Sequence, residues 1–249
     1  MPSFASYPSL KDRSVFISGG GSGIGASIVE HFAAQGSKVG FVDIDEPASK
    51  AIAAKTGALF IKCDIRDVKA YQAAIGEVAG KHGPITALVN NAARDDRHEL
   101  EDVTPEFFDE RIAVNLRHAF FAIQAVAPGM KKAGGGSIVN FSSISYHTMT
   151  ANLSVYQAAK AATIGMTRGL ARDLGADKIR LNSITPGWIM TQRQIDLWLT
   201  PEAEADLMKA QVLKEKVYPP DIARMALFLA ADDSQLISGQ NFVVDGGRM

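Results

Sequence analysis

The stretch Ser14-Val-Phe-Ile-Ser-Gly-Gly-Gly-Ser-Gly-Ile-Gly25 decides the fold of this 249-residue chain. Its first five residues form a short apolar run, which predicts a buried strand, and apolar residues at helical spacing follow it. Glycines between a strand and a helix let backbone N–H groups approach a pyrophosphate, which then faces the positive end of the helix dipole. The spacing is GxxxGxG, at Gly19, Gly23 and Gly25. We therefore predict a dinucleotide site at this turn, with a merely flexible loop as the alternative.

Six further apolar runs alternate with stretches of helical spacing, at residues 39–42, 58–61, 85–89, 137–141, 179–183 and 241–244. Repeated β-then-α units imply right-handed crossovers and a parallel sheet with helices on both faces. The predicted fold class is α/β, a Rossmann-type doubly wound sheet of about seven parallel strands. Length favours one domain over residues 1–249. Residues 190–220 fit the alternation least well, and we expect them to form a lid over the substrate.

Composition and charge exclude several classes of partner. The chain is 47% hydrophobic and has a formal net charge of −1. It therefore lacks the excess of positive charge that binds nucleic acid or an anionic membrane. It has no apolar run of about 18 residues, and its first residues lack the pattern of a signal peptide. The single cysteine, Cys63, excludes a cysteine-cluster metal site. The sequence therefore predicts a cytoplasmic protein without a metal, membrane or nucleic-acid partner.

Tyr156-Gln-Ala-Ala-Lys160 is the candidate for catalysis. Residues four apart on a helix share a face, and an ammonium beside a phenol lowers the pKa of the phenol. Such a tyrosine can act as an acid or base near neutral pH. The pattern alone is weak evidence, because a surface lysine near a tyrosine occurs often by chance.

Asp43 ends the second predicted strand. A carboxylate at this point can accept both ribose hydroxyls and repels a 2′-phosphate. Neither Ser22 nor Ile44 offers a basic side chain that could pair with that phosphate. We read the cofactor as NAD, although a shift of the loop could admit NADP.

In these features the chain resembles the short-chain dehydrogenase/reductase family over nearly its whole length. Besides the glycine turn, Asn90-Asn-Ala-Ala93 resembles the family's NNAG element, with Ala93 in place of glycine. Asn115, Ser143, Tyr156 and Lys160 fall on the family's catalytic tetrad. The resemblance implies cofactor contacts at Gly19, Ser22, Gly23, Ile24, Asp43, Asp64, Ile65, Asn91, Tyr156, Lys160, Pro186, Gly187, Ile189 and Thr191.

The resemblance also implies a mechanism. Tyr156 would take the proton of the substrate hydroxyl while a hydride passes to the nicotinamide, and Lys160 would lower the pKa of Tyr156 and hold the ribose. Ser143 would hydrogen-bond the reacting oxygen, and Asn115 would hold a water that links Lys160 to solvent. The choice of Ser143 over Ser142 or Ser145 depends on its spacing of thirteen residues from Tyr156.

The residues expected around the substrate are mainly polar and aromatic, which suits a polyhydroxylated molecule. The stretches Asp95-Asp-Arg-His98, Asn115-Leu-Arg-His118 and Gln192-Arg-Gln194 resemble the bacterial aldose 1-dehydrogenases. That resemblance implies oxidation of the anomeric hydroxyl of a pentose such as D-xylose or L-arabinose to a lactone. The candidate substrate-binding residues are Asp95, Arg97, His98, Ser143, Ser145, His147, Trp188, Gln192, Arg193 and Trp198.

Two other functions stay open at this point. One is a dehydrogenase or reductase of another small alcohol or ketone, of 3-oxoacyl or polyol type, and the other is a non-catalytic NAD-binding sensor or scaffold. The cluster at 95–97 could also be an ordinary surface salt-bridge cluster. Finally, the helices expected at 106–127 and 156–174 carry apolar residues on more than one face. Since the family pairs these helices between subunits, the resemblance implies a homotetramer.

Overall fold

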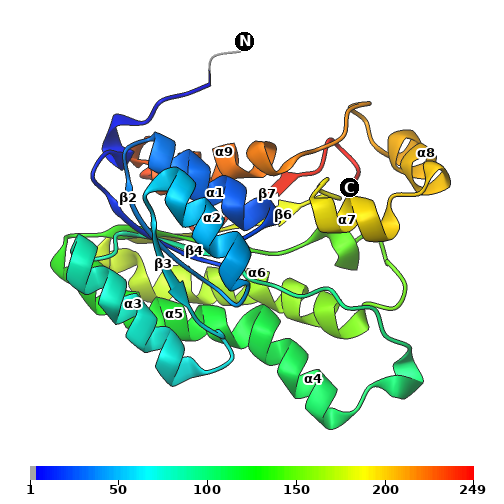
Figure 1. Ribbon diagram of the computed structural model, residues 1–249, viewed down its shortest axis with the longest axis horizontal. Coiled ribbons are helices and arrows are strands. Elements are labelled where there is room, and N and C mark those ends of the chain that lie inside the picture. The colour runs from blue at the N-terminus through cyan, green and yellow to red at the C-terminus, as the bar shows by residue number, and fades with distance from the viewer. Residues whose placement is uncertain (1–3) are drawn as a thin grey trace.

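Seven parallel strands form one sheet in the order β3-β2-β1-β4-β5-β6-β7 (Figure 1). The computed structural model describes residues 4–249. Residues 1–3 of the predicted domain lie outside the described residues. The predicted doubly wound α/β fold is confirmed. The strands are β1 (Ser14–Ser18), β2 (Lys38–Asp43), β3 (Leu59–Lys62), β4 (Ala87–Asn90), β5 (Gly136–Phe141), β6 (Ile179–Pro186) and β7 (Asn241–Val244).

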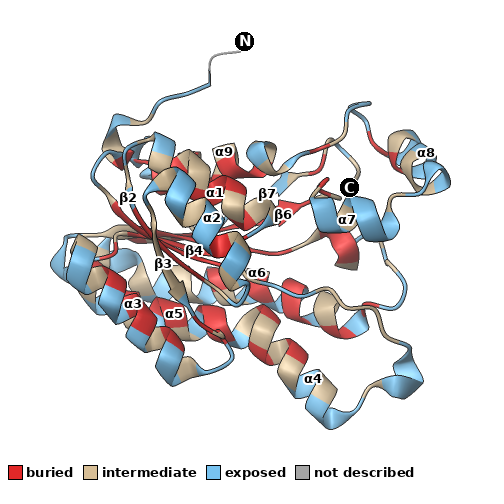
Figure 2. Cartoon of the chain, in the orientation of Figure 1, coloured by how far each residue is buried: buried red, intermediate tan, exposed pale blue. Residues whose placement is uncertain are grey.

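Helices cover both faces of the sheet (Figure 1). The helices α1 (Gly23–Ala34), α2 (Glu46–Thr56) and α9 (Pro219–Ala230) lie on one face, and α3 (Val68–His82), α5 (His118–Lys132) and α6 (Ser154–Leu174) lie on the other. Figure 2 shows the inner strands of the sheet buried between these two layers. Each layer of helices packs on the sheet to form an apolar core. The core on the α1 side contains Phe32, the core on the α3 side contains Tyr71, and both residues are fully buried.

The last crossover departs from the expected hand. The strands β5, β6 and β7 follow one another in the same direction across the sheet, yet α6 and α9 lie on opposite faces. The two crossovers therefore have opposite hands. The segment between β6 and α9 gives the chain enough length to pass to the other face, and it contains α7 (Gln192–Trp198) and α8 (Pro201–Ala210). Both helices lie within residues 190–220, the segment that fits the alternation least well.

The helix expected at 106–127 is interrupted. It consists of α4 (Pro105–Ile112), a single π-helical turn over Ala113–Arg117, and then α5. A π-helical turn adds a residue to the helix, and such turns are frequent at functional sites. Asn115 lies in this turn and is 2% exposed. The insertion thus directs one polar side chain of a helix into the protein.

Across residues 4–249, no helix has the length and apolar character that crossing a membrane requires. The same residues contain no group of three or more His, Cys, Asp or Glu side chains placed to hold a metal ion.

Candidate active site

Gly25, the last glycine of the turn after β1, is packed too closely for any other side chain. A Cβ atom at Gly25 would lie 1.7 Å from the carbonyl oxygen of Gly19. Ser22, the N-cap of α1, makes no capping hydrogen bond through its side chain, whereas Asp45 and Asp67 cap α2 and α3. The first N–H groups of α1 are therefore left for an anion, as the binding of a pyrophosphate requires.

Hydrogen bonds join this turn to the end of β4. The Ser18 hydroxyl accepts from the backbone N–H groups of Asn91 and Ala92, both at 3.1 Å. The amide of Asn91 donates back to the carbonyl oxygens of Ser18 and Gly19 at 3.1 and 3.0 Å. The hydroxyl kept at Ser18 thus fixes the carboxyl ends of two neighbouring strands, where ligands of a doubly wound sheet bind.

Two adjoining cavities run along this edge of the sheet, with volumes of about 510 and 440 Å³. Tyr156, Asn91 and Thr191 line both, so the cavities form one continuous cleft. Every residue predicted to bind the cofactor lines the cleft. The larger cavity holds Gly19, Ser22, Gly23, Ile24, Asp43, Asp64, Ile65, Asn91, Tyr156 and Thr191, and the smaller holds Lys160, Pro186, Gly187 and Ile189.

Asp43 lies where a ribose contact requires it, at the end of β2 and in the wall of the larger cavity. Its Oδ2 accepts from the backbone N–H of Gly21 at 2.9 Å, and its Oδ1 accepts from that of Asp45 at 3.0 Å. Each carboxylate oxygen keeps further lone pairs for hydroxyl donors. The polar groups around the cleft therefore fit a dinucleotide. The free N–H groups at the start of α1 would face its phosphates, and the Asp43 carboxylate, at the end of the neighbouring strand, would accept from a ribose.

Lys160 is buried beneath the cleft. Its ammonium donates to the carbonyl oxygen of Phe141 at 2.9 Å, and Nζ lies 5.6 Å from the centre of the Tyr156 ring. The side chains of Tyr156 and Lys160 come from the first two turns of α6, as their spacing predicts. Burial lowers the pKa of Lys160 to about 8, and the Asp95 carboxylate opposes that shift.

The pKa of Tyr156 differs from the expectation. Burial raises it well above the ordinary value, and the negative charge of Asp95 acts in the same direction. A hydrogen bond from Ser143 and the positive charge of Arg193 lower it in part. The Lys160 ammonium donates to a backbone carbonyl, and no hydrogen bond joins it to Tyr156 among the described residues. A cationic ligand beside Tyr156 would lower the pKa of the tyrosine further.

The structure distinguishes the three neighbouring serines that follow β5. Ser142 donates to the carbonyl oxygen of Lys160 at 2.7 Å and is buried, so its role is structural. Ser143 caps the short turn after it by accepting from the N–H of Ser145 at 3.2 Å, and its side chain lowers the pKa of Tyr156. The Ser145 hydroxyl is buried without a hydrogen-bond partner among the described residues. These contacts support Ser143 as the catalytic serine.

Asn115 holds the loop that follows β4. Its amide donates to the carbonyl oxygens of Arg94 and Arg111, both at 3.0 Å, and its Oδ1 accepts from the N–H of Arg94 at 2.9 Å. Both donors of the amide are thus engaged by the backbone. The expected water next to Lys160 would have to use the second lone pair of Oδ1 or the Asn115 backbone carbonyl.

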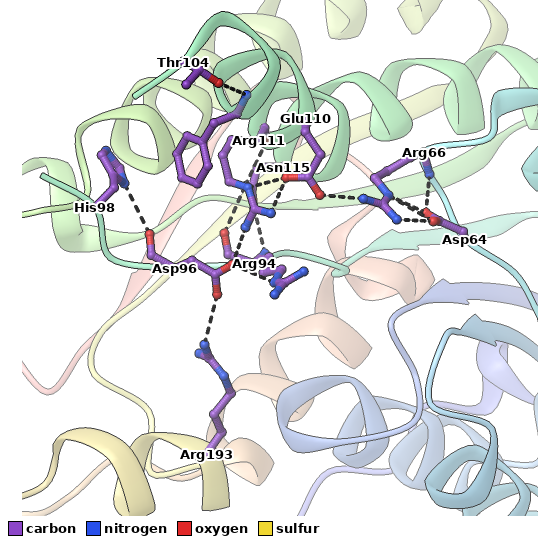
Figure 3. A network of polar contacts seen from close by, with 11 residues as sticks. Asp64, Arg66, Arg94, Asp96, His98, Thr104, Glu110, Arg111, Asn115 and Arg193 are labelled. Carbon is purple, nitrogen blue, oxygen red and sulfur yellow. Dashed lines mark hydrogen bonds and ion pairs between the residues drawn. The ribbon is translucent and has the colours of Figure 1, made fainter. Parts of the chain in front are cut away.

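A chain of ion pairs extends from this loop in two directions (Figure 3). Arg111 pairs with Asp96 at 2.6 Å and with Glu110, and Asp96 in turn pairs with Arg193 of α7. Glu110 also pairs with Arg66 at 2.6 Å, and Arg66 pairs with Asp64. The chain therefore joins Asp64, in the wall of the larger cavity, to the loop and to α7. Asp95 adds two further contacts to α7, with Arg193 and with the amide of Gln194 at 2.9 Å.

The ten substrate candidates divide into three groups. Asp95, Arg97, Ser143, Ser145, Trp188 and Trp198 line the smaller cavity, whereas Gln192 and Arg193 line the larger one. His98 and His147 line neither. The His98 ring pairs with the Ser154 hydroxyl at 3.1 Å and packs on Phe107, and the exposed His147 stacks on Tyr146. These histidines hold local structure instead of lining the cleft.

Sequence reasoning missed several residues of the smaller cavity, namely Thr148, Thr150, Leu153, Gln194 and Arg248. Gln194 lies in the Gln192-Arg-Gln194 stretch that the resemblance had singled out, so a signal for it was present. Arg248 has no local signal, because its place depends on how the end of β7 folds back toward β6.

A parallel sheet with a glycine turn, an uncapped helix and a Tyr–Lys pair beside a polar cavity is the arrangement of a nicotinamide-dependent oxidoreductase. Residues 19–248 match a family model described as enoyl-(acyl carrier protein) reductase. A solved short-chain type dehydrogenase/reductase from Mycobacterium ulcerans superposes with a TM-score of 0.91 at 27% identity, covering 98% of this chain and 91% of that one. The chain belongs to the short-chain dehydrogenase/reductase family and is an oxidoreductase acting on CH–OH groups.

Two curated relatives are more similar in sequence. The Rhizobium meliloti protein named "Probable galactose dehydrogenase GalD" is 50% identical over 97% of this chain and 96% of its own length. D-xylose 1-dehydrogenase of Caulobacter vibrioides is 48% identical over 98% of this chain and 99% of its own. A blue fluorescent protein from a metagenomic library, solved in complex with NADPH, superposes with a TM-score of 0.89 at 33% identity, covering 96% of this chain and 99% of that one.

Proposed function

We propose that this enzyme oxidises the anomeric hydroxyl of an aldose, a pentose such as D-xylose or L-arabinose, to the lactone. The observation that carries the proposal is the wall of the cavity beside Tyr156, where Asp95, Arg97 and Ser145 offer polar groups and Trp188 and Trp198 offer flat apolar faces. Such a wall suits a ring with many hydroxyl groups on one side and C–H groups on the other. The two curated relatives, with names of sugar dehydrogenases, support the same substrate class.

The chain's own residues handle the proton. Tyr156, in its deprotonated form, accepts the proton of the substrate hydroxyl, and Ser143 hydrogen-bonds the same oxygen and stabilises the charge that develops on it. Lys160 provides a buried positive charge one helical turn from Tyr156. A nicotinamide cofactor, when bound, supplies the hydride acceptor. Gly19, Asp43, Asp64 and Thr191 would hold it in the larger cavity, and Gly187 would border its reactive end in the smaller one.

NAD is the proposed cofactor, with NADP as the competitor. The support is Asp43, since a carboxylate at the end of β2 accepts ribose hydroxyls and repels a 2′-phosphate. The relative efficiency kcat/KM with NAD and NADP tests the preference in the wild-type enzyme. Asp43→Ser should shift the ratio toward NADP, and an unchanged ratio would show that Asp43 does not set it.

The segment 190–220 is proposed as the substrate lid. Its helix α7 is attached to the loop after β4 by side-chain contacts, among them those of Arg193 with Asp95 and Asp96. Because Arg193 is 47% exposed, water can compete for these contacts. A lid would open by breaking them, so hydrogen exchange in α7 should slow when cofactor and substrate bind.

A cytoplasmic homotetramer remains a prediction from the family resemblance. Phe108 of α4 and Phe120 of α5 are each 43% exposed, and helices of a subunit interface would cover such side chains. Light scattering at micromolar concentration measures the assembly, and a monomer would refute the prediction.

A panel of pentoses, hexoses, polyols and ketones, assayed with NAD and NADP, tests the proposed reaction. We expect the highest kcat/KM with aldoses, and the product should be a lactone that hydrolyses to the aldonic acid. Turnover of polyols or 3-oxoacyl compounds without aldoses would assign the enzyme to another substrate class. Cofactor binding without turnover of any compound would favour the sensor or scaffold alternative.

A further inference from the structure

One charged side chain of the smaller cavity has no protein partner. Arg248 lines this cavity together with Ser143, Tyr156 and Trp188. Its guanidinium carries five N–H donors, and no residue within 4–249 forms a hydrogen bond or an ion pair with it. The negative charge that acts on Arg248 is that of Asp245. The Asp245 carboxylate accepts from the backbone N–H groups of Gly247 and Met249, both at 2.8 Å.

The other charged groups of this cavity differ from Arg248 in that each has at least one protein partner, although the Arg97 Nε is buried without one among the described residues. Lys160 donates to the carbonyl oxygen of Phe141, and Asp95 is bound by Arg193 and Gln194. Arg97 donates to the carbonyl oxygen of Ala151 at 3.0 Å and lies over the Trp198 ring at 4.8 Å. Half-buried donors that stay unpaired cost free energy, and Arg248 is the charged side chain of this cavity whose whole guanidinium is left for a ligand.

The backbone holds Arg248 in place. After β7 the chain turns at Gly246, where φ is +67° and an added Cβ would lie 2.3 Å from the amide nitrogen of Gln211. The carbonyl oxygens of Gly246 and Gly247 accept from the N–H groups of Leu213 and Val212 at 2.8 and 3.1 Å. Gly246 and Gly247 are thus attached to the segment that follows α8. The backbone that carries Arg248 is already fixed, so only its side chain has to be ordered when a ligand binds.

The same turn lies against the strand that borders the reacting end of the cleft. A Cβ added to Gly187 would come within 2.7 Å of the Cα of Asp245. Gly187 itself lines the cavity next to Trp188. The guanidinium therefore enters the cavity from the β6–β7 side, whereas Asp95 and Arg97 enter it from the loop after β4.

We propose that Arg248 is a substrate-binding residue that determines specificity, and that its guanidinium donates to hydroxyl oxygens of the sugar other than the anomeric one. The proposal rests on the proposed aldose dehydrogenase function. Two neighbouring N–H groups of a guanidinium match a pair of adjacent oxygen acceptors, so the recognised feature is a vicinal pair of hydroxyl groups. A site built to hydrogen-bond a hydroxyl group discriminates against the analogue that lacks it.

The test compares wild type, Arg248→Met and Arg248→Gln on an aldose that the wild type oxidises and on its 2-, 3- and 4-deoxy analogues. Arg224→Met is the matched control, because Arg224 lies on α9, pairs with Asp221 and lines neither cavity. For the parent sugar we expect kcat/KM to fall roughly 10- to 100-fold in both Arg248 variants and to stay near wild type in the control. The affinity for NADH should not change.

The deoxy analogues separate substrate binding from a structural role. The wild type should lose at least roughly tenfold in kcat/KM on the analogue that lacks a contacted hydroxyl, and this loss should nearly vanish in the Arg248 variants. If the variants show the wild-type pattern of losses, or if they lose cofactor affinity in parallel with activity, Arg248 does not bind the sugar. A wild-type enzyme that oxidises no aldose would instead refute the proposed function itself.

Discussion

The two halves of the cleft are held by different kinds of contact. The half that we call catalytic contains the proposed catalytic residues Asn115, Ser143, Tyr156 and Lys160. Asn115 and Lys160 are 2% exposed and hydrogen-bonded to backbone carbonyls. The loop half consists of Asp95, Asp96, Arg97, Arg193 and Gln194. Its ion pairs join side chains that are between 24% and 47% exposed.

This difference separates chemistry from substrate choice. Buried hydrogen bonds to the backbone leave the catalytic half few alternative arrangements, so proton transfer is performed with fixed geometry. Exposed ion pairs are screened by water and salt, so the loop half can rearrange at little cost. The sheet can therefore keep one reaction while changes in the loops alter which alcohol is accepted.

The largest effect is expected from Tyr156→Phe in the catalytic half. Removal of the hydroxyl takes away the group that accepts the substrate proton, so kcat should fall by roughly 10³-fold. The affinity for NADH, measured by fluorescence, should remain near that of the wild type. Turnover close to wild type would show that another group accepts the proton.

The next effect distinguishes two adjacent serines. Ser143→Ala should lower kcat roughly 100-fold, because a donor to the reacting oxygen is lost. Ser142→Ala is the matched control, since that hydroxyl only donates to the carbonyl oxygen of Lys160. It should cost about 1 kcal/mol of stability and change kcat little. The reverse ranking in kcat would move the catalytic role to Ser142.

These two expectations illustrate what sequence could predict. The glycine turn, Asp43 and the tetrad could be placed because each is fixed by local spacing or by the end of a strand. All predicted cofactor residues accordingly line the cleft. The seven strands followed from short apolar runs. Inner strands such as β1 and β4 are fully buried between two layers of helices, whereas the edge strands β3 and β7 are only partly buried.

Residues whose role depends on distant partners could not be placed in this way. His98 and His147 are polar and near the motifs, yet their rings contact Ser154 and Tyr146. Arg248 was missed because its position depends on packing of the turn at 245–247 against Gly187 and Gln211. The opposite hand of the last crossover follows from the length of the 190–218 segment, which periodicity alone does not reveal.

Arg111 joins the two halves, and its loss should affect both. The Arg111 side chain lies between Asp96 and Glu110 and is 7% exposed. The backbone carbonyl oxygen of Arg111 accepts from the Asn115 amide. Arg111→Met leaves both carboxylates without this partner, although their own partial exposure reduces the penalty to about 2–3 kcal/mol. The melting temperature should fall by roughly 5–10 °C.

An exposed ion pair provides the control for Arg111. Lys55→Met breaks the pair of Lys55 with Glu30, in which the lysine is 65% exposed, and should change stability by less than about 0.5 kcal/mol. Calorimetry of both variants gives the comparison. Equal shifts in melting temperature would mean that burial does not distinguish the Arg111 cluster from a surface pair.

The smallest expected effect is a shift in the pH dependence of kcat/KM when a charge in the loop half is removed. We predict only the direction of this shift. Oxidation needs deprotonated Tyr156, so kcat/KM rises with pH toward the pKa of that residue. The carboxylate of Asp95 raises this pKa and the guanidinium of Arg193 lowers it. Asp95→Asn removes a negative charge and leaves Asp96 as the remaining ion-pair partner of Arg193. Both changes favour the phenolate, so the rising limb should move to lower pH.

Arg193→Gln should have the opposite effect on the same limb. It removes a positive charge near Tyr156 and leaves Asp95 without its partner, so the pKa of Tyr156 rises and the limb moves to higher pH. The pH profiles of kcat/KM, recorded at saturating cofactor for wild type and both variants, measure these shifts. Opposite displacements would show that the loop half acts on the tyrosine through its charges. Displacement in the same direction would show that losing the ion pair rearranges the loop, and the catalytic half would then depend on the loop half for its geometry.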